Sequence, residues 1–304
     1  MKNTIVFLAG PTAVGKTRIA ISLAKKINAE IVSCDSMQIY KTMDILTSKP
    51  PRILRKEVPH HLVDIVSPAR EYDVTQYRRG ALRTAKEIIR KGKIPLFVGG
   101  TGLYISVLID GIFHSAAKDA KIRKKLYQLA QKKGSRFLYE RLRKIDPPAA
   151  DKIHPNDTKR IVRALEVFEA SGKPISKLQK QRQGLADDYD VKIFCLNMPR
   201  EKLYQRIDAR VEKMFRQGLV AEVKKLLKLK LSKTAAYAIG IREIKGYLDG
   251  LYGLDEVKRL IKKHTRNYAK RQLTWFRRDK RIEWINVCEE DRASQVTSRI
   301  NSYL

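Results

Sequence analysis

Residues 10–17 read GPTAVGKT and complete the phosphate-loop pattern G-x-x-x-x-G-K-[ST]. The apolar run Ile5–Leu8 precedes this loop, and a helix-like segment from Arg18 to Lys26 follows it. This order forms a site for a diphosphate group, because the N–H groups of the loop and of the helix N-terminus point at the anion. Lys16 is placed to reach the distal phosphates, and the Thr17 hydroxyl to bind Mg²⁺. We therefore predict chemistry on a phosphate ester.

The chain is strongly basic. It has 304 residues, of which 64 are Lys or Arg and 32 are Asp or Glu, so the formal net charge is +32. Such a surplus repels itself unless a polyanion relieves it, and nucleic acid is the natural candidate. A basic surface without a polyanion partner is the alternative.

The spacing of the cysteines indicates a reducing compartment, and the hydropathy indicates neither secretion nor a membrane span. Cys34, Cys195 and Cys288 lie far apart and form no C-x-x-C pair, so the sequence indicates neither a disulfide framework nor a zinc module. No leader pattern and no run of about 18 apolar residues is present. We expect a cytoplasmic protein without membrane contact.

Strand-like and helix-like segments alternate in most of the chain. The alternation predicts an α/β fold, in which a P-loop parallel sheet core is flanked by helices. The helix-like pattern is clearest at 77–91, and a last short strand-like run lies at 282–287. The other strand-like runs are residues 4–8, 30–33, 62–66, 95–98 and 191–196.

The alternation stops after Gly111. Residues 118–182 are polar and helix-like, with 19 Lys or Arg against 7 Asp or Glu. Asp157 or Asn156 can cap a helix here that ends at Ser171, before Gly172. We predict a helical insertion domain, in which the cations near the start of this helix face solvent or a ligand. The predicted parts are 1–115 for the first part of the core, 116–188 for the insertion, and 189–304 for the second part with its basic helices.

Two segments at strand ends indicate the chemistry. Asp35 follows the second strand near the phosphate loop, where it could act as a base or bind substrate, hold Mg²⁺, or cap the next turn. The strand at 95–98 is followed by Gly99-Gly100-Thr101, where a hydrolase would often show an acid. Asp64 is a weak rival for that acidic role. A phosphate loop without a hydrolytic apparatus indicates a transferase.

Residues 258–281 contain 11 Lys or Arg and a single acid, with Tyr268, Trp275 and Phe276 among them. Guanidinium and aromatic planes stack on bases while lysines bind phosphates, so this mixture favours an RNA loop as ligand. The alternative is a basic amphipathic helix in which Trp275 and Phe276 belong to the core.

Six segments in this order resemble the bacterial tRNA dimethylallyltransferase (isopentenyl-tRNA transferase) family, and the resemblance covers nearly the whole chain. The segments are GPTAVGKT (10–17), DSMQIY (35–40), PHHLVDI (59–65), VGGTGLY (98–104), HPNDTKRIVRALEVF (154–168) and YAKRQLTWFRR (268–278). Two positions depart from the family pattern: DILTSKP (44–50) replaces DIGTAKP, and Gly240-Ile241-Arg242 replaces Gly-Tyr-Lys. The second change puts in doubt any tRNA contact that the tyrosine makes.

The resemblance implies transfer of a dimethylallyl group from dimethylallyl diphosphate to N6 of the adenosine just 3′ of the anticodon, with Mg²⁺ as cofactor. Asp35 would be the general base, and Lys16 and Arg210 would stabilise the departing diphosphate, with Thr101 as a further catalytic residue. The diphosphate would be bound by Gly10, Pro11, Thr12, Ala13, Val14, Gly15, Lys16 and Thr17, with Thr17 as metal ligand.

The resemblance also implies contacts with a tRNA anticodon stem-loop by a monomeric enzyme. The implied tRNA-binding residues are Asp35, Ser36, Met37, Gln38, Thr101, Arg123, Lys159, Arg160, Ile161, Val162, Arg163, Lys270, Arg271, Gln272, Trp275 and Arg277. Three other functions are alternatives. An adenylate prenyltransferase would not need the basic segments, a small-molecule kinase would consume ATP, and an RNA-binding ATPase would need a metal-holding acid after an apolar strand.

Overall fold

The computed structural model describes residues 2–113, 119–288 and 290–304, and within them one parallel sheet forms the centre of the fold. Six strands of the described residues pair in the order β3-β2-β4-β1-β5-β6, and all neighbouring pairs are parallel. The strands are β1 (Thr4–Ala9), β2 (Ala29–Cys34), β3 (His60–His61), β4 (Ile94–Gly99), β5 (Asp190–Asn197) and β6 (Glu283–Asn286). The predicted α/β fold is confirmed.

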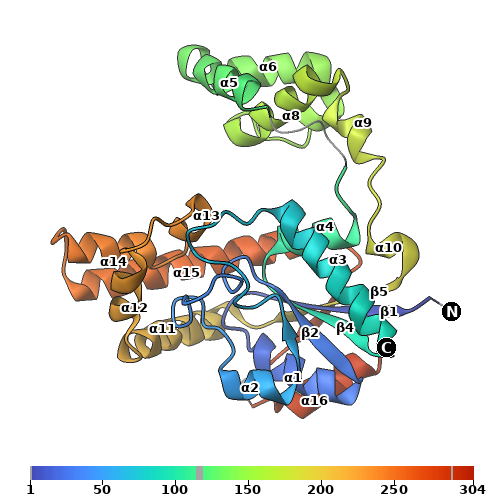
Figure 1. Cartoon of the computed structure of the whole chain (residues 1–304), viewed down its shortest axis with the longest axis vertical. Helices are drawn as coiled ribbons and strands as arrows, with labels where there is room; N and C mark the ends of the chain where they lie inside the picture. Colours follow the sequence, from blue (N-terminus) through green and yellow to red (C-terminus); the bar gives the residue numbers. More distant parts are fainter. Residues whose placement is uncertain (1, 114–118, 289) are drawn as a thin grey trace. The chain divides into compact units, whose positions relative to one another are not determined.

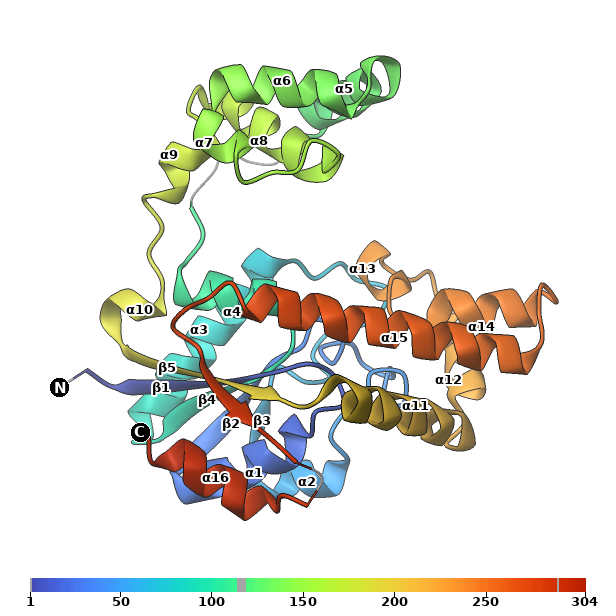
Figure 2. The same ribbon diagram turned by 180° about the vertical axis from the view of Figure 1, so that it is seen from behind.

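The central strands are apolar because helices cover both faces of the sheet. Ile5 to Ala9 of β1 are fully buried, as expected for a parallel strand without a solvent face. Phe7 and Phe97 stack across β1 and β4, with their ring centroids 4.8 Å apart. In both ribbon views α1, α2 and α16 lie on one side of the sheet, and α3, α4 and α15 lie on the other (Figures 1 and 2).

The first compact unit comprises residues 1–109 and 188–304. Beside the sheet, α11, α12, α14 and α15 form a second apolar core with the segment that follows β2. The helices of this unit are α1 (Lys16–Lys26), α2 (Arg52–Glu57), α3 (Val74–Arg90), α4 (Gly102–Ile109), α11 (Arg200–Arg216), α12 (Leu219–Leu226), α13 (Lys233–Ala236), α14 (Ile241–Leu248), α15 (Leu254–Phe276) and α16 (Ala293–Asn301).

The second compact unit comprises residues 110–187 and has its own apolar core. The predicted first boundary, between 115 and 116, lies outside the described residues. Asp157 caps α8, since its carboxylate accepts a hydrogen bond from the Arg160 N–H at 3.2 Å, and Gly172 ends the helix with φ 67°. The helices are α5 (Ala120–Lys133), α6 (Ser135–Ile145), α7 (Pro147–Ala150), α8 (Thr158–Ser171) and α9 (Ile175–Gln179), and α10 (Leu185–Asp188) lies at the boundary.

The strand predicted at 62–66 is wrong. The strand beside β2 consists of His60 and His61 alone, and Leu62 and Asp64 both have positive φ values, 59° and 58°. Extended pairing requires negative φ, so the chain leaves the sheet at Leu62. Val66 returns only as an isolated bridge to Tyr40.

No helix of the described ranges combines the length and the apolar composition that crossing a membrane requires.

Candidate active site

The phosphate loop connects β1 to α1. Gly10 has φ 147°, and a Cβ at this position would lie 3.1 Å from the Leu196 carbonyl oxygen on β5. Only glycine fits such a close approach without strain. Gly15 has φ 103° and stands directly before the first helical residue, Lys16. The backbone therefore has the strand, loop and helix order that suits an anion.

Lys16 lies folded over its own loop. Its Nζ donates hydrogen bonds to the Gly10 oxygen at 2.9 Å and to the Pro11 oxygen at 2.7 Å. Burial lowers the pKa of Lys16 to about 8; the Asp35 carboxylate opposes this shift, and the Arg210 guanidinium adds to it. An anionic ligand would favour the charged ammonium over the neutral amine.

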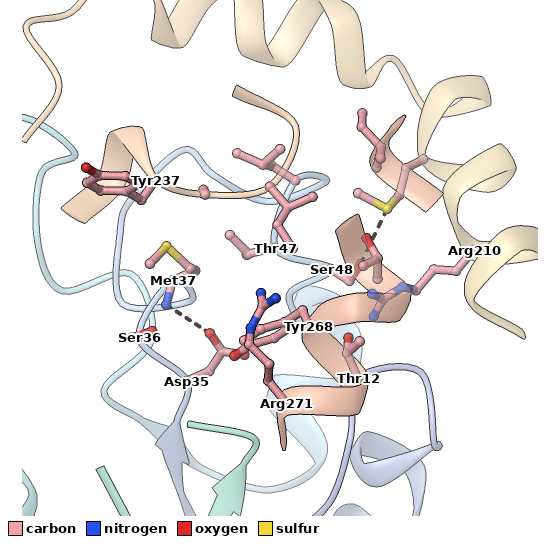
Figure 3. Close-up of a pocket in the computed structure, with 16 residues that line it drawn as sticks. Thr12, Asp35, Ser36, Met37, Thr47, Ser48, Arg210, Tyr237, Tyr268 and Arg271 are labelled. Atoms are coloured by element: carbon pink, nitrogen blue, oxygen red, sulfur yellow. Dashed lines mark hydrogen bonds between the residues drawn. The ribbon is translucent and has the colours of Figure 1, made fainter. Parts of the chain in front are cut away.

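Asp35 follows the end of β2. Its Oδ1 accepts hydrogen bonds from the Met37 N–H at 2.9 Å and from the Gln38 N–H at 3.3 Å. One oxygen therefore caps the turn, which was one of the three roles considered for this residue. The same side chain also lines a cavity (Figure 3). Capping by one oxygen leaves the other available for chemistry.

Thr101 joins the ends of β4 and β2. Its N–H donates to the Cys34 oxygen at 3.1 Å, and its Oγ1 accepts from the Ser36 N–H at 3.1 Å. These bonds hold Thr101 and Ser36 against each other beside Asp35. The sequence places these residues at the carboxyl ends of neighbouring strands, and the structure brings them together.

A cavity of about 270 Å³ opens above these strand ends. Figure 3 shows Thr12 of the phosphate loop, Asp35, Arg210 and Tyr268 around it. Its lining also includes Ser36, Met37, Leu46, Thr47, Ser48, Met214, Tyr237, Ala238, Ile239, Ile261, Thr265 and Arg271. The cavity is thus lined by the Asp35 carboxylate, the Arg210 guanidinium and apolar side chains.

Arg210 reaches this cavity from α11. Its Nε is buried and has no hydrogen-bond partner among the described residues. Burial lowers the pKa of Arg210, and the Asp35 carboxylate opposes that shift. Buried N–H groups are normally paired, so an unpaired one beside a cavity indicates an anionic ligand.

The helix α15 contributes one face to the cavity; the sequence indicates Tyr268 and Arg271 of this face as RNA-binding candidates but does not single out Ile261 and Thr265. Ile261, Thr265 and Tyr268 line the cavity, and their spacing of four and three residues is that of one helix face. Burial raises the pKa of the Tyr268 hydroxyl and the Asp35 carboxylate adds to this rise, whereas the nearby Thr101 and Gln272 side chains oppose it. Helical spacing could have identified this face, whereas the loop residues Leu46 to Ser48 carried no comparable signal.

The residues of α15 predicted to bind tRNA divide into two groups. Lys270, Arg271 and Arg277 are exposed, whereas Gln272 is buried. The Gln272 amide accepts from the Thr12 N–H and donates to the Gly100 oxygen, each at 2.9 Å, so it ties the phosphate loop to the end of β4. A contact between its side chain and RNA does not fit this placement.

Trp275 is 37% exposed and packs on Gly102, where a Cβ would lie 2.3 Å from the indole ring. Phe276 is a core residue, which is the alternative considered for it. The exposed edge of Trp275 is therefore the part of this pair that an RNA base could reach.

The predicted tRNA-binding residues of the insertion also divide. Lys159 and Arg160 are exposed, but Ile161 and Val162 are buried in the core of the unit, so their side chains are not available to RNA. Arg123 and Arg163 both donate to Oε2 of buried Glu166, at 2.6 and 2.9 Å. The carboxylate holds two half-exposed arginines of α5 and α8 side by side.

Comparison with known proteins shows the family of the chain. The family model "IPP transferase" matches residues 38–279, and the model "Isopentenyl transferase" matches residues 3–55. The chain is 49% identical to a tRNA dimethylallyltransferase of Carboxydothermus hydrogenoformans, over 99% of this chain and 97% of that one. It is 46% identical to the enzyme of that name from Thermotoga maritima, over 94% and 93% of the two chains.

Solved structures agree with this result. The tRNA isopentenylpyrophosphate transferase of Bacillus halodurans superposes with a TM-score of 0.72 at 37% identity, over 100% of this chain and 96% of that one. A eukaryotic dimethylallyltransferase acting on tRNA superposes with a TM-score of 0.83 at 30% identity, over 98% and 77% of the two chains. The phosphate loop, the cavity and these likenesses together show that the chain belongs to the IPP transferase family of tRNA dimethylallyltransferases.

Proposed function

We propose that this tRNA dimethylallyltransferase uses the cavity beside Asp35 to prenylate N6 of the adenosine just 3′ of the anticodon, with dimethylallyl diphosphate as donor. The observation that supports this assignment is that Asp35, Arg210 and Thr12 of the phosphate loop line one cavity. An acceptor of the N6 proton and cations for the leaving group are therefore close together.

The reaction forms a bond between N6 and C1 of the dimethylallyl group and breaks the bond between C1 and the diphosphate oxygen. The electron pair of the broken bond leaves with the diphosphate, and N6 loses a proton. Adenine N6 is a weak nucleophile because its lone pair is delocalised into the ring. A carboxylate hydrogen-bonded to N6–H therefore raises its reactivity as the C–O bond breaks.

Asp35 is the proposed base. Its Oδ1 is fixed by the Met37 and Gln38 N–H groups, which orients the carboxylate at the cavity. Thr101 and Ser36, bonded to each other, lie beside it and are proposed to contact the tRNA strand near the target adenosine. Met37 and Gln38 belong to the same proposed contact.

The diphosphate is proposed to bind backbone N–H groups of the loop at residues 10–17, apart from Pro11, which has no N–H, and Thr12, whose N–H donates to Gln272. Lys16 already lies over this loop, and the Arg210 Nε beside it has no hydrogen-bond partner in the described ranges of the chain. Preorganised cations stabilise the negative charge that develops on the leaving oxygen, and the apolar wall of the cavity excludes water from the allylic cation.

Mg²⁺ is proposed to bind through Thr17. Thr17 and Asp35 line a smaller cavity of about 50 Å³ behind the phosphate loop, and the Ser33 hydroxyl in its wall is buried without a partner in the described part of the chain. The Thr17 and Ser33 hydroxyls are oxygen donors that fit Mg²⁺, which keeps most of its ligands as water and phosphate oxygens. Asp64 does not belong to this set, because it pairs with Lys49 and Arg55. The metal would neutralise the diphosphate.

The tRNA is proposed to bind along exposed and half-exposed cations. In the first unit these are Lys270, Arg271 and Arg277 with the edge of Trp275, and in the second unit Arg123, Lys159, Arg160 and Arg163. Phosphate contacts by such residues position the RNA, while the cavity selects the base.

The test is nucleoside mass spectrometry of unmodified tRNA after incubation with enzyme, Mg²⁺ and dimethylallyl diphosphate. We expect one adenosine to gain the mass of a dimethylallyl group, and fragments should place it next to the anticodon. Free AMP and ATP are tested in parallel. Prenylation of free nucleotide in preference to tRNA, or transfer of phosphate from ATP, would assign the site to a nucleotide prenyltransferase or a kinase instead.

A further inference from the structure

One carboxylate binds three successive backbone N–H groups beside the cavity. Glu222 Oε2 accepts from the Asp44 N–H at 3.0 Å and from the Ile45 N–H at 2.9 Å, and its Oε1 accepts from the Leu46 N–H at 2.8 Å. Successive N–H groups that converge on one anion form a nest, which is a strong and directional arrangement. Glu222 lies in the first turn of α12, far away in the sequence.

The segment that Glu222 binds forms part of the cavity wall. Leu46, Thr47 and Ser48 line the cavity together with Asp35 and Arg210. The Leu46 Cδ1 also packs against Gly240, where an added Cβ would lie 2.6 Å away. Any movement of residues 44–46 therefore moves the wall that faces the reacting groups.

The backbone of this segment is held in unusual conformations. Thr42 and Ser48 flank residues 44–46, and their φ values of 61° and 49° lie in the left-handed region that residues other than glycine rarely adopt. Such conformations persist where surrounding groups fix them. Two side chains fix this loop. The buried Lys49 Nζ donates to the Tyr40 oxygen and to Asp44, and the Glu222 carboxylate accepts from the backbone N–H groups.

We propose that Glu222 is a positioning residue of the transferase, which holds residues 44–48 as the wall against which the two substrates align. This inference rests on the proposed function of the cavity. Reacting groups must be aligned closely, and a displacement of about 1 Å can lower a rate roughly 100-fold. The phosphate loop is not bonded to Glu222, so diphosphate binding does not depend on it.

The test compares Glu222→Gln with Glu256→Gln. Both residues are glutamates in the first turn of a helix, so both changes remove the same favourable charge at a helix N-terminus. Unlike Glu222, Glu256 accepts its hydrogen bond from the Arg259 side chain at the surface and not from the backbone of a loop. The amide of Glu222→Gln loses one acceptor oxygen, while the bonds of Lys49 still hold the inside of the loop.

We expect faster amide hydrogen exchange in residues 44–46 of Glu222→Gln, and a single-turnover rate of prenyl transfer about 10 to 100 times lower at saturating substrates. Affinity for inorganic diphosphate, measured by calorimetry, should stay within twofold of wild type. Glu256→Gln should match wild type in all three measurements.

Unchanged exchange, or faster exchange with an unchanged rate, would overturn the positioning role. An equal loss of diphosphate affinity would also overturn it, because the effect would then be a general loss of structure. A wild-type enzyme that makes no prenylated tRNA would instead refute the proposed function, and the exchange measurement would still report on the loop.

Discussion

Asp35 combines a structural and a chemical role in one side chain. Its Oδ1 holds the turn after β2, and asparagine would retain this acceptor because its amide oxygen can occupy the same place. An amide cannot take the N6 proton. We therefore expect Asp35→Asn to bind both substrates and to lose roughly 10²–10⁴-fold in single-turnover rate, measured by quenched-flow with labelled donor.

Asp249→Asn is the control for this change, since Asp249 is an exposed carboxylate that pairs with Lys245 on α14. It should react at the wild-type rate. If Asp35→Asn lost Mg²⁺-dependent diphosphate binding but kept its rate at saturating metal, Asp35 would be a metal ligand and not the base.

The pKa of Lys16, lowered to about 8 by burial, predicts a pH dependence of diphosphate binding. The charged ammonium is the form that binds an anion. It is present below pH 8 in the free enzyme and is lost as the pH rises above 8. The Kd for inorganic diphosphate should therefore rise by up to about tenfold per pH unit above 8.

Calorimetry of wild type and Lys16→Ala measures this change of the Kd for inorganic diphosphate with pH. The titrations run from pH 6.5 to pH 9.5, roughly the range needed to bracket the pKa of Lys16. The alanine variant reports the titration of the ligand alone, so the difference between the two curves belongs to Lys16. Parallel curves would show that Lys16 does not titrate in this range.

At the scale of elements, regular segments could be predicted and irregular ones could not. Strand β1 and helix α8 have continuous apolar or periodic patterns with recognisable caps, and both form. The run at 62–66 is apolar except for Asp64, but Leu62 and Asp64 adopt positive φ, which a hydrophobic pattern does not reveal. Residues 46–48 of the cavity wall could not be predicted either, because the bond that fixes Leu46 comes from Glu222, which is 176 residues away in the sequence.

The tie between α15 and the phosphate loop is testable at this scale. Gln272→Ala would leave the Thr12 N–H and the Gly100 oxygen without their partner. We expect the free energy of unfolding to fall by about 1–3 kcal/mol, the usual cost of such groups. Urea denaturation measures it, with Gln205→Ala on the exposed face of α11 as control. Equal stability of the two variants would contradict the structural role of Gln272.

At the scale of the whole molecule, the net charge of +32 favours an anionic partner but does not specify which one. Sequence alone predicted the basic insertion, but not which of its cations are oriented. In the structure Arg163 is fixed on buried Glu166, whereas Arg160 pairs with Asp157, at 3.3 Å, on the surface. Fixed and exposed cations near one helix start form the part of this unit that we expect to meet phosphates.

Each phosphate contact releases condensed counterions, so the logarithm of tRNA affinity should fall linearly with the logarithm of salt concentration. Replacing Arg160 and Arg163 together by alanine should weaken binding of an anticodon stem-loop and flatten this slope by up to about two units. The control replaces Arg141 and Arg143 of α6, which removes the same charge from the same unit. Fluorescence titrations at several salt concentrations measure both variants. Equal flattening in the two would attribute the effect to net charge, and an unchanged slope in the first would remove the start of α8 from the RNA-binding surface.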